Sequence, residues 1–185
     1  MKELLLIFKF LVSPQPSWRE MVDAGKPAVE HERKWFYPLM ALAAATAFLS
    51  MLYGAELTAA LTKGIVIFAS FFLSYQLCPA LMTWSIRKFC GVRCVESEMG
   101  DKFKYFAMLN MSMLIVVTVI QNILPVPLQP LYIFPLCLFY PISRCAGEFG
   151  IDDERKSFFS LAMFACTILV PVSLLLILWH FVPES

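Results

Sequence analysis

Charged residues are scarce in this chain of 185 residues, in which Asp, Glu, Lys and Arg make up only 16%. Hydrophobic residues make up 59% and the mean hydropathy is +0.71, a profile typical of membrane proteins with several spans. No segment the size of a soluble domain is left over, so one compact bundle is expected. The net charge of +1 gives no long-range attraction to nucleic acid, and no nucleic-acid partner is expected.

Catalytic signatures are also missing. The sequence contains no Gly-x-Ser-x-Gly, no His-Glu-x-x-His and no glycine-rich phosphate-binding loop. Its two histidines, His31 and His180, are expected at opposite faces of the membrane, where they cannot act together. These absences indicate a protein that is not an enzyme and has no cofactor.

The six cysteines lie mostly inside or beside apolar runs, which is typical of packing residues and not of an extracellular disulfide framework. Cys90 and Cys94 have a spacing that zinc sites tolerate, and Cys145 is expected on the same side of the membrane. A fourth ligand is missing, so we expect reduced cysteines and no metal.

The longest stretch without charge runs from Tyr105 to Ser143 and exceeds the roughly 20 helical residues that cross a bilayer once. Three prolines between Leu124 and Pro130 remove backbone donors and fix φ, so we predict a helical hairpin with a tight turn. We expect the two helices of this hairpin to form the packing centre of the protein.

The apolar pattern predicts an all-α integral membrane protein with a bundle of five transmembrane helices in residues 35–185. The predicted spans cover approximately residues 38–54, 64–86, 105–123, 131–143 and 158–181. The fourth is short, and Pro135 and Pro141 predict that it is bent or tilted. The first is rich in alanine, whose small side chain lets membrane helices approach closely.

Residues 1–34 are predicted to form a cytoplasmic segment with interfacial, amphipathic helices. Residues 1–12 are too short an apolar run to cross the membrane, and a cleaved signal peptide is the rival interpretation. Ser17 and Glu20 have the spacing of a capping box, with Trp18 expected to point toward the membrane. The charged residues 30–34 are expected to be solvated.

The distribution of Lys and Arg predicts the orientation. Six lie in the N-terminal segment, five in the loop after the second span and three in the loop after the fourth, whereas Lys63 alone lies on the other side. The N-terminus is therefore predicted to be cytoplasmic and the C-terminus external.

Four amide side chains are the candidate polar contacts inside the membrane: Gln76, Asn110, Gln121 and Asn122. Asn110 and Gln121 are eleven residues apart and share a helix face. Because lipid offers no hydrogen bonds, these groups either join helices or line a cavity or partner contact. No Asp, Glu, Lys or Arg lies within a predicted span, which argues against ion-coupled transport, although Glu56 and Lys63 near the external surface could reach inward.

Several short motifs resemble the Yip family of five-span membrane proteins, particularly its bacterial members. The matching residues are Ser13-Pro14 with Trp18 after an amphipathic start, Tyr37-Pro38-Leu39 opening the first span, the turn Leu124–Pro130, and Leu138-Phe-Tyr140 before a polar loop ending in Lys156. The resemblance implies a cytoplasmic N-terminal segment, five clustered spans and almost no external tail.

In eukaryotes the family is associated with Rab-type GTPases and with vesicle traffic. The Asp-Leu-Tyr-Gly-Pro type motif ahead of the first span is not found here, which argues against GTPase binding. We therefore predict a non-enzymatic scaffold or interaction protein of Yip-like type. Its predicted location is a lipid bilayer, with a bacterial inner membrane favoured. Its predicted partner is another membrane protein or a second copy of itself. A small-solute or lipid transporter or channel is the alternative, and a membrane enzyme with an unrecognised motif is a third possibility.

Overall fold

The structure is a computed structural model that describes residues 9–10, 12–23, 27–90, 96–124, 134–151 and 153–180. Within these ranges nearly every residue is helical and no strand occurs, which confirms the all-α prediction. Four helices there are long and apolar enough to cross a membrane: Ala28–Tyr53, Leu57–Lys88, Gly100–Ile123 and Asp153–Trp179. They lie at the positions of the predicted first, second, third and fifth spans.

The first long helix is assembled from four pieces. α3 (Ala28–His31) continues through a π-helical turn, η1 (Glu32–Phe36), into α4 (Tyr37–Thr46) and a 3-10 segment, η2 (Ala47–Tyr53). Gly54 ends the helix at φ 93°, a conformation that a side chain would strain. The helix thus begins ten residues before the predicted span and includes the charged residues 30–34.

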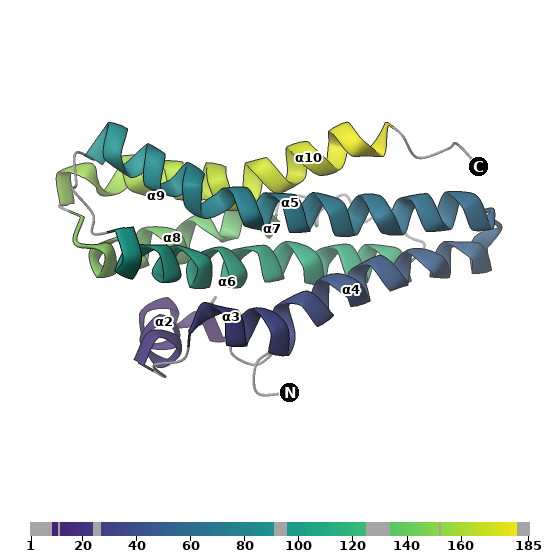
Figure 1. The fold of residues 1–185 in the computed structure, drawn as a ribbon, viewed down its shortest axis with the longest axis horizontal. Helices are drawn as coiled ribbons and strands as arrows, with labels where there is room; N and C mark the ends of the chain where they lie inside the picture. The colour runs from purple at the N-terminus through teal and green to yellow at the C-terminus, as the bar shows by residue number, and fades with distance from the viewer. Residues whose placement is uncertain are drawn as a thin grey trace.

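α5 (Leu57–Cys90) and α6 (Glu96–Ile123) run side by side in opposite directions along the length of the bundle (Figure 1). α6 is the most buried of the four long helices. It packs against α4 and α5, while α10 (Val170–Trp179) packs on the other side of α5. The core of the bundle therefore forms around α6.

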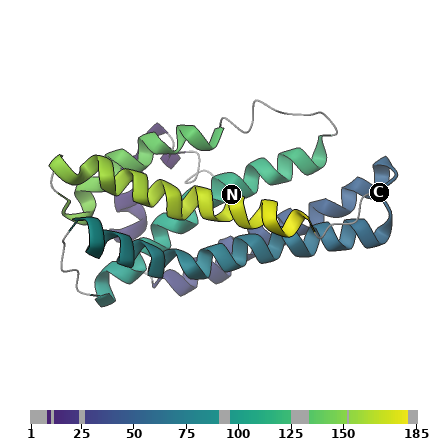
Figure 2. The same cartoon turned by 90° about the horizontal axis from the view of Figure 1, so that it is seen from above.

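The last long helix begins with a 3-10 turn, η5 (Asp153–Arg155), and continues through α9 (Lys156–Phe164) and a π-helical turn, η6 (Ala165–Leu169), into α10. Seen from above, it crosses over the bundle between α5 and the α8 side (Figure 2). α8 (Phe139–Cys145) packs mainly on α9 and α2. The prediction that the third and fourth spans together form the packing centre is therefore wrong for the fourth span, because α6 packs mainly on α4 and α5.

The predicted fourth span is described only from Phe134, as the short helices α7 (Phe134–Cys137) and α8, which are separated at Leu138. Pro135 and Pro141 predict a bend in this segment. Residues 131–133 and the predicted turn, apart from Leu124, lie outside the described residues. The five-helix count therefore stays a prediction.

The N-terminal helix α2 (Pro14–Asp23) begins three residues before the predicted capping position. The Ser17 hydroxyl donates to the Ser13 carbonyl at 2.9 Å, so the predicted capping box is wrong. Pro14 can open the helix because its fixed φ and missing N–H suit the first turn. Most of residues 1–12 lie outside the described residues, so the interfacial placement of that run stays a prediction.

Small residues bring α4 and α5 into close contact, as the alanine-rich first span predicts. A Cβ atom added to Gly64 would lie 3.0 Å from the Ala44 carbonyl oxygen and 3.8 Å from Ala47 Cβ. Because the nearest atom belongs to the backbone, a larger side chain can be accommodated only if the helices separate.

Replacing Gly64 with valine is expected to destabilise the bundle by about 1–3 kcal/mol, the usual cost of overpacking a close contact. The measurement is an SDS unfolding titration in mixed micelles. Gly100→Val is the matched control, because Gly100 also lies in a helix and an added Cβ there meets nothing within 4 Å. Equal stability of the two variants would show that α4 and α5 do not touch at Gly64.

Candidate functional site

Two polar sites lie at opposite ends of the interface between the first long helix, α5 and α6. The glutamate site contains Glu32, and the outer pocket contains Lys63 and Gln121. α6 contributes Lys104 to the glutamate site and Gln121 to the outer pocket. These residues are seventeen positions apart, which corresponds to about 26 Å along a helix. This separation is close to the roughly 30 Å thickness of the hydrocarbon core of a bilayer.

At the glutamate site, the side chain of Glu32 is only 8% exposed. Its Oε1 accepts a hydrogen bond from the Tyr75 hydroxyl at 2.7 Å, and its Oε2 accepts one from the Tyr37 hydroxyl at 3.1 Å. The Lys104 ammonium lies 3.8 Å from Oε1. A buried charge is tolerated only when it is paired and hydrogen-bonded, and here three helices supply the partners.

Aromatic side chains surround the glutamate site. The Phe36 and Tyr75 rings lie 4.7 Å apart between centroids, and the Trp35 indole N–H donates to His31 Nδ1 at 3.4 Å. Trp35 and Phe36 belong to the π-helical turn that begins at Glu32, and such turns are frequent at functional sites. The turn brings the carboxylate to the same side as the rings.

The prediction that residues 30–34 are solvated is therefore wrong for His31 and Glu32, both of which are buried. Their charge pattern resembles a solvated run, and only the partners on α5 and α6 make burial possible. One sequence pattern points to Glu32: it precedes the buried residues Phe36, Met40 and Ala43 by four, eight and eleven residues, the spacing of one helix face.

Three charged residues of these two sites lie in the candidate membrane helices, just outside the predicted spans. Glu32, Lys63 and Lys104 fall inside the helices Ala28–Tyr53, Leu57–Lys88 and Gly100–Ile123. They precede the predicted spans, which begin at residues 38, 64 and 105, so the spans themselves remain without charge.

The outer pocket has a volume of about 450 Å³. Its polar walls come from η2, α5 and α6, and the residues that contribute are Ser50, Tyr53, Gly54, Lys63, Gln121 and Asn122. A volume of this size is within the range of small-molecule sites. Two of the four amides singled out in the sequence therefore face a common pocket.

Hydrogen bonds between α6 and the first long helix hold one wall of the outer pocket. The Asn122 amide donates to Thr46 Oγ1 at 3.0 Å and lies 3.4 Å from the Ala43 carbonyl oxygen. The Tyr53 hydroxyl donates to the Ile123 carbonyl at 3.3 Å. Asn122 is thus an interhelical contact and a pocket residue at once.

The other two amides lie elsewhere. Asn110 is fully buried in α6, where its amide donates to the Phe106 carbonyl of the same helix at 2.9 Å. Its Oδ1 has no hydrogen-bond partner among the described residues. Gln76 is exposed on α5. Asn110 and Gln121 therefore do not act together at one site.

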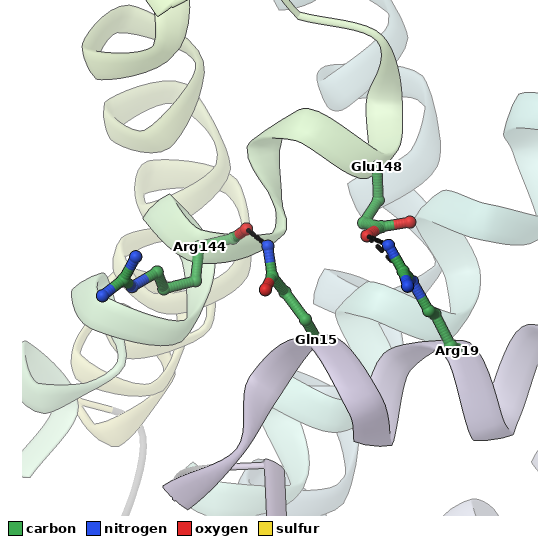
Figure 3. Close-up of polar contacts among 4 residues, drawn as sticks. All are labelled: Gln15, Arg19, Arg144 and Glu148. Carbon is green, nitrogen blue, oxygen red and sulfur yellow. Dashed lines mark hydrogen bonds and ion pairs between the residues drawn. The ribbon is translucent and has the colours of Figure 1, made fainter.

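A third polar contact fixes α2 on the connection between α8 and α9 (Figure 3). Arg19 Nε and Nη2 donate to Glu148 Oε1 at 3.1 and 2.8 Å, and the Gln15 amide donates to the Arg144 carbonyl at 3.0 Å. Between these contacts the Trp18 ring is buried, 5.3 Å from Phe149 between centroids. The prediction that Trp18 points toward the membrane is therefore wrong, because the ring packs inside the bundle.

No group of three His, Cys, Asp or Glu side chains in the described part of the chain could hold a metal. The side chain of Cys90 and all of Cys94 lie outside that part, so the expected absence of a metal there stays a prediction. Burial, and secondarily the charge of Glu148, raises the pKa of the Cys145 thiol to about 12. Cys145 is therefore a protonated packing residue at neutral pH.

The fold and these sites define a class: an all-helical protein with four helices able to cross a membrane, held together by polar contacts at both ends. Comparisons of the chain with family models, with curated proteins and with solved structures found no match.

Proposed function

We propose that the chain is an integral membrane protein with five spans, of the Yip-like type, that acts without catalysis as a scaffold or interaction protein. The observation that carries this proposal is the docking of α2. It joins the N-terminal segment to the connection between α8 and α9 through Arg19 and Glu148. This contact gives one polar, structured surface at the basic end of the bundle, which we propose to be cytoplasmic and suited to a protein partner.

The same contact supports the fifth span. α6 ends at Ile123 beside the outer pocket, whereas Arg144 lies at the opposite end of the bundle against α2. The two described ends of the segment between them therefore lie at opposite ends of the bundle. If the long helices cross the membrane, this segment is the predicted fourth span.

The exposed surfaces of the long helices support the bilayer as their environment. Large apolar side chains on α5 and α10 are exposed, among them Leu73 and Leu77 on α5 and Leu176 and Ile177 on α10. Water would not favour so much exposed apolar surface, whereas lipid chains cover it without cost.

A reporter fusion tests the topology. Alkaline phosphatase fused after Ser185 is expected to be active, and the same enzyme inserted at Gly150 is expected to be inactive, because fourteen of the fifteen Lys and Arg residues lie on the proposed cytoplasmic side. Fluorescent-protein fusions at both positions should give the opposite pattern. Activity of the phosphatase at Gly150 would show that the fourth segment does not cross.

Photo-crosslinking in intact membranes tests the interaction role. A crosslinking amino acid at the exposed positions Gln15 or Glu20 of α2 should capture one recurrent protein at native expression levels, and the same group at Leu176 on α10 should not. Crosslinks only to a second copy of the chain would identify a homo-oligomer. No crosslink from α2 would contradict the proposed role of this surface.

The outer pocket favours a second candidate function, the handling of a small solute or a lipid. It is an open, polar pocket of about 450 Å³ at the end of three helices, and binding there requires no catalytic group.

A further inference from the structure

We infer that the outer pocket binds a phosphate-bearing ligand, with the Lys63 ammonium as its charge partner and the Gln121 carboxamide as a second donor. The inference rests on the second candidate function and names its ligand class. The shared chemistry is a phosphate ester, supplied either by the headgroup of a phospholipid in the outer leaflet or by a soluble phosphorylated molecule.

The charge in the pocket is positive and uncompensated. Lys63 is the one basic residue on the predicted external side, and it lines the pocket. No carboxylate lines the pocket within the described residues. Glu56, seven residues earlier, is exposed and accepts a hydrogen bond from the Thr58 hydroxyl at 3.4 Å. An anion entering the pocket therefore meets a half-buried ammonium without a competing acid.

The position of the ammonium is set by an aromatic ring. Lys63 Nζ lies 5.6 Å from the centre of the Trp179 ring, a cation–π contact that leaves the hydrogen-bond donors of the ammonium available. A lysine ammonium is a common point-charge partner of phosphate. The exposed Leu52 and Trp179 lie on the two long helices beside the pocket, so they can contact the acyl chains of a lipid.

The other side-chain donors that line the pocket already make hydrogen bonds within the protein, so Lys63 and Gln121 are left to bind an anion. The Ser50 hydroxyl donates to the Ala47 carbonyl at 2.6 Å, while Tyr53 and Asn122 donate to Ile123 and Thr46. Among the residues the structure describes, no hydrogen bond joins the Gln121 amide to another group. Its N–H groups and the ammonium are therefore the two donors free to hold phosphate oxygens.

The test measures binding to the full chain in dodecyl maltoside, a detergent without phosphate. The probes are dioctanoyl phosphatidylglycerol and glycerol 3-phosphate, followed by tryptophan fluorescence and native mass spectrometry. Saturable binding is expected, weakened about tenfold by Lys63→Gln, the loss of one charge-assisted contact, and retained by Lys63→Arg. Gln121→Leu should weaken it by about threefold, the loss of one neutral hydrogen bond.

Lys88→Gln is the matched control, because Lys88 lies over the Trp84 ring at 4.9 Å near the other end of α5. Binding of the lipid alone identifies a headgroup site, and binding of both probes identifies a phosphate-ester site. No binding of either probe, or equal loss with Lys88→Gln, overturns the inference. If Lys63→Gln does not fold, Gln121→Leu and Lys63→Arg decide the question. Correct topology together with absent binding would refute the site and leave the five-span proposal intact.

Discussion

Replacing Glu32 with alanine is expected to destabilise the protein by roughly 2–4 kcal/mol. The substitution removes the acceptor for the Tyr75 hydroxyl at 2.7 Å and for the Tyr37 hydroxyl at 3.1 Å. The Tyr75 side chain is buried, so its hydroxyl would remain without an acceptor. Lys104 is partly exposed and can recover its hydration, which limits the loss.

Glu32→Gln separates charge from hydrogen bonding. The glutamine carbonyl can still accept from Tyr75, but the attraction to Lys104 is lost, so about half the destabilisation is expected. Glu30→Ala is the matched control, because Glu30 is an exposed carboxylate on the same helix and exposed substitutions usually change stability by less than about 0.5 kcal/mol. The measurement is an SDS unfolding titration. Equal loss for Glu30→Ala and Glu32→Ala would show that the buried acceptor does not hold the three helices together.

Replacing Trp18 with alanine is expected to release α2 from the bundle. The Trp18 ring is 2% exposed and contacts the Phe106 and Phe149 rings at 5.7 and 5.3 Å between centroids. Removing a buried tryptophan costs about 3–5 kcal/mol. Because α2 packs on α8 and α6 and is not part of the four long helices, the cost is expected to appear as local opening and not as unfolding of those helices.

Limited trypsin digestion measures this opening, since cleavage after Arg19 requires α2 to leave its site. The cleavage rate is expected to rise at least tenfold in Trp18→Ala. Glu148→Ala should raise it much less, because the Arg19–Glu148 pair is exposed and such pairs contribute up to about 1 kcal/mol. Val12→Ala, at a position that is 81% exposed, should leave the rate unchanged. Similar rates in all three variants would show that the ring does not anchor α2.

Apolar length determined most of the fold. Runs such as residues 105–123 contain no charge, and a backbone in such a run satisfies its hydrogen bonds only by forming a helix. Four of the five predicted spans coincide with long helices for this reason. The alanine-rich first span also predicted the close contact at Gly64, because small side chains permit it wherever a partner helix lies.

Tertiary structure decided which polar residues are buried and what they contact. The amides of Gln121 and Asn122 were visible in the sequence as polar groups at membrane depth, but their common pocket with Lys63 depends on how α6 meets η2 and α5. Glu32 and Trp18 were assigned to water and to lipid, and both are buried in the protein. Hydropathy reports how costly it is to bury a side chain alone. The partners that offset this cost are distant in the sequence: Tyr75 lies 43 residues after Glu32, and Phe106 lies 88 residues after Trp18.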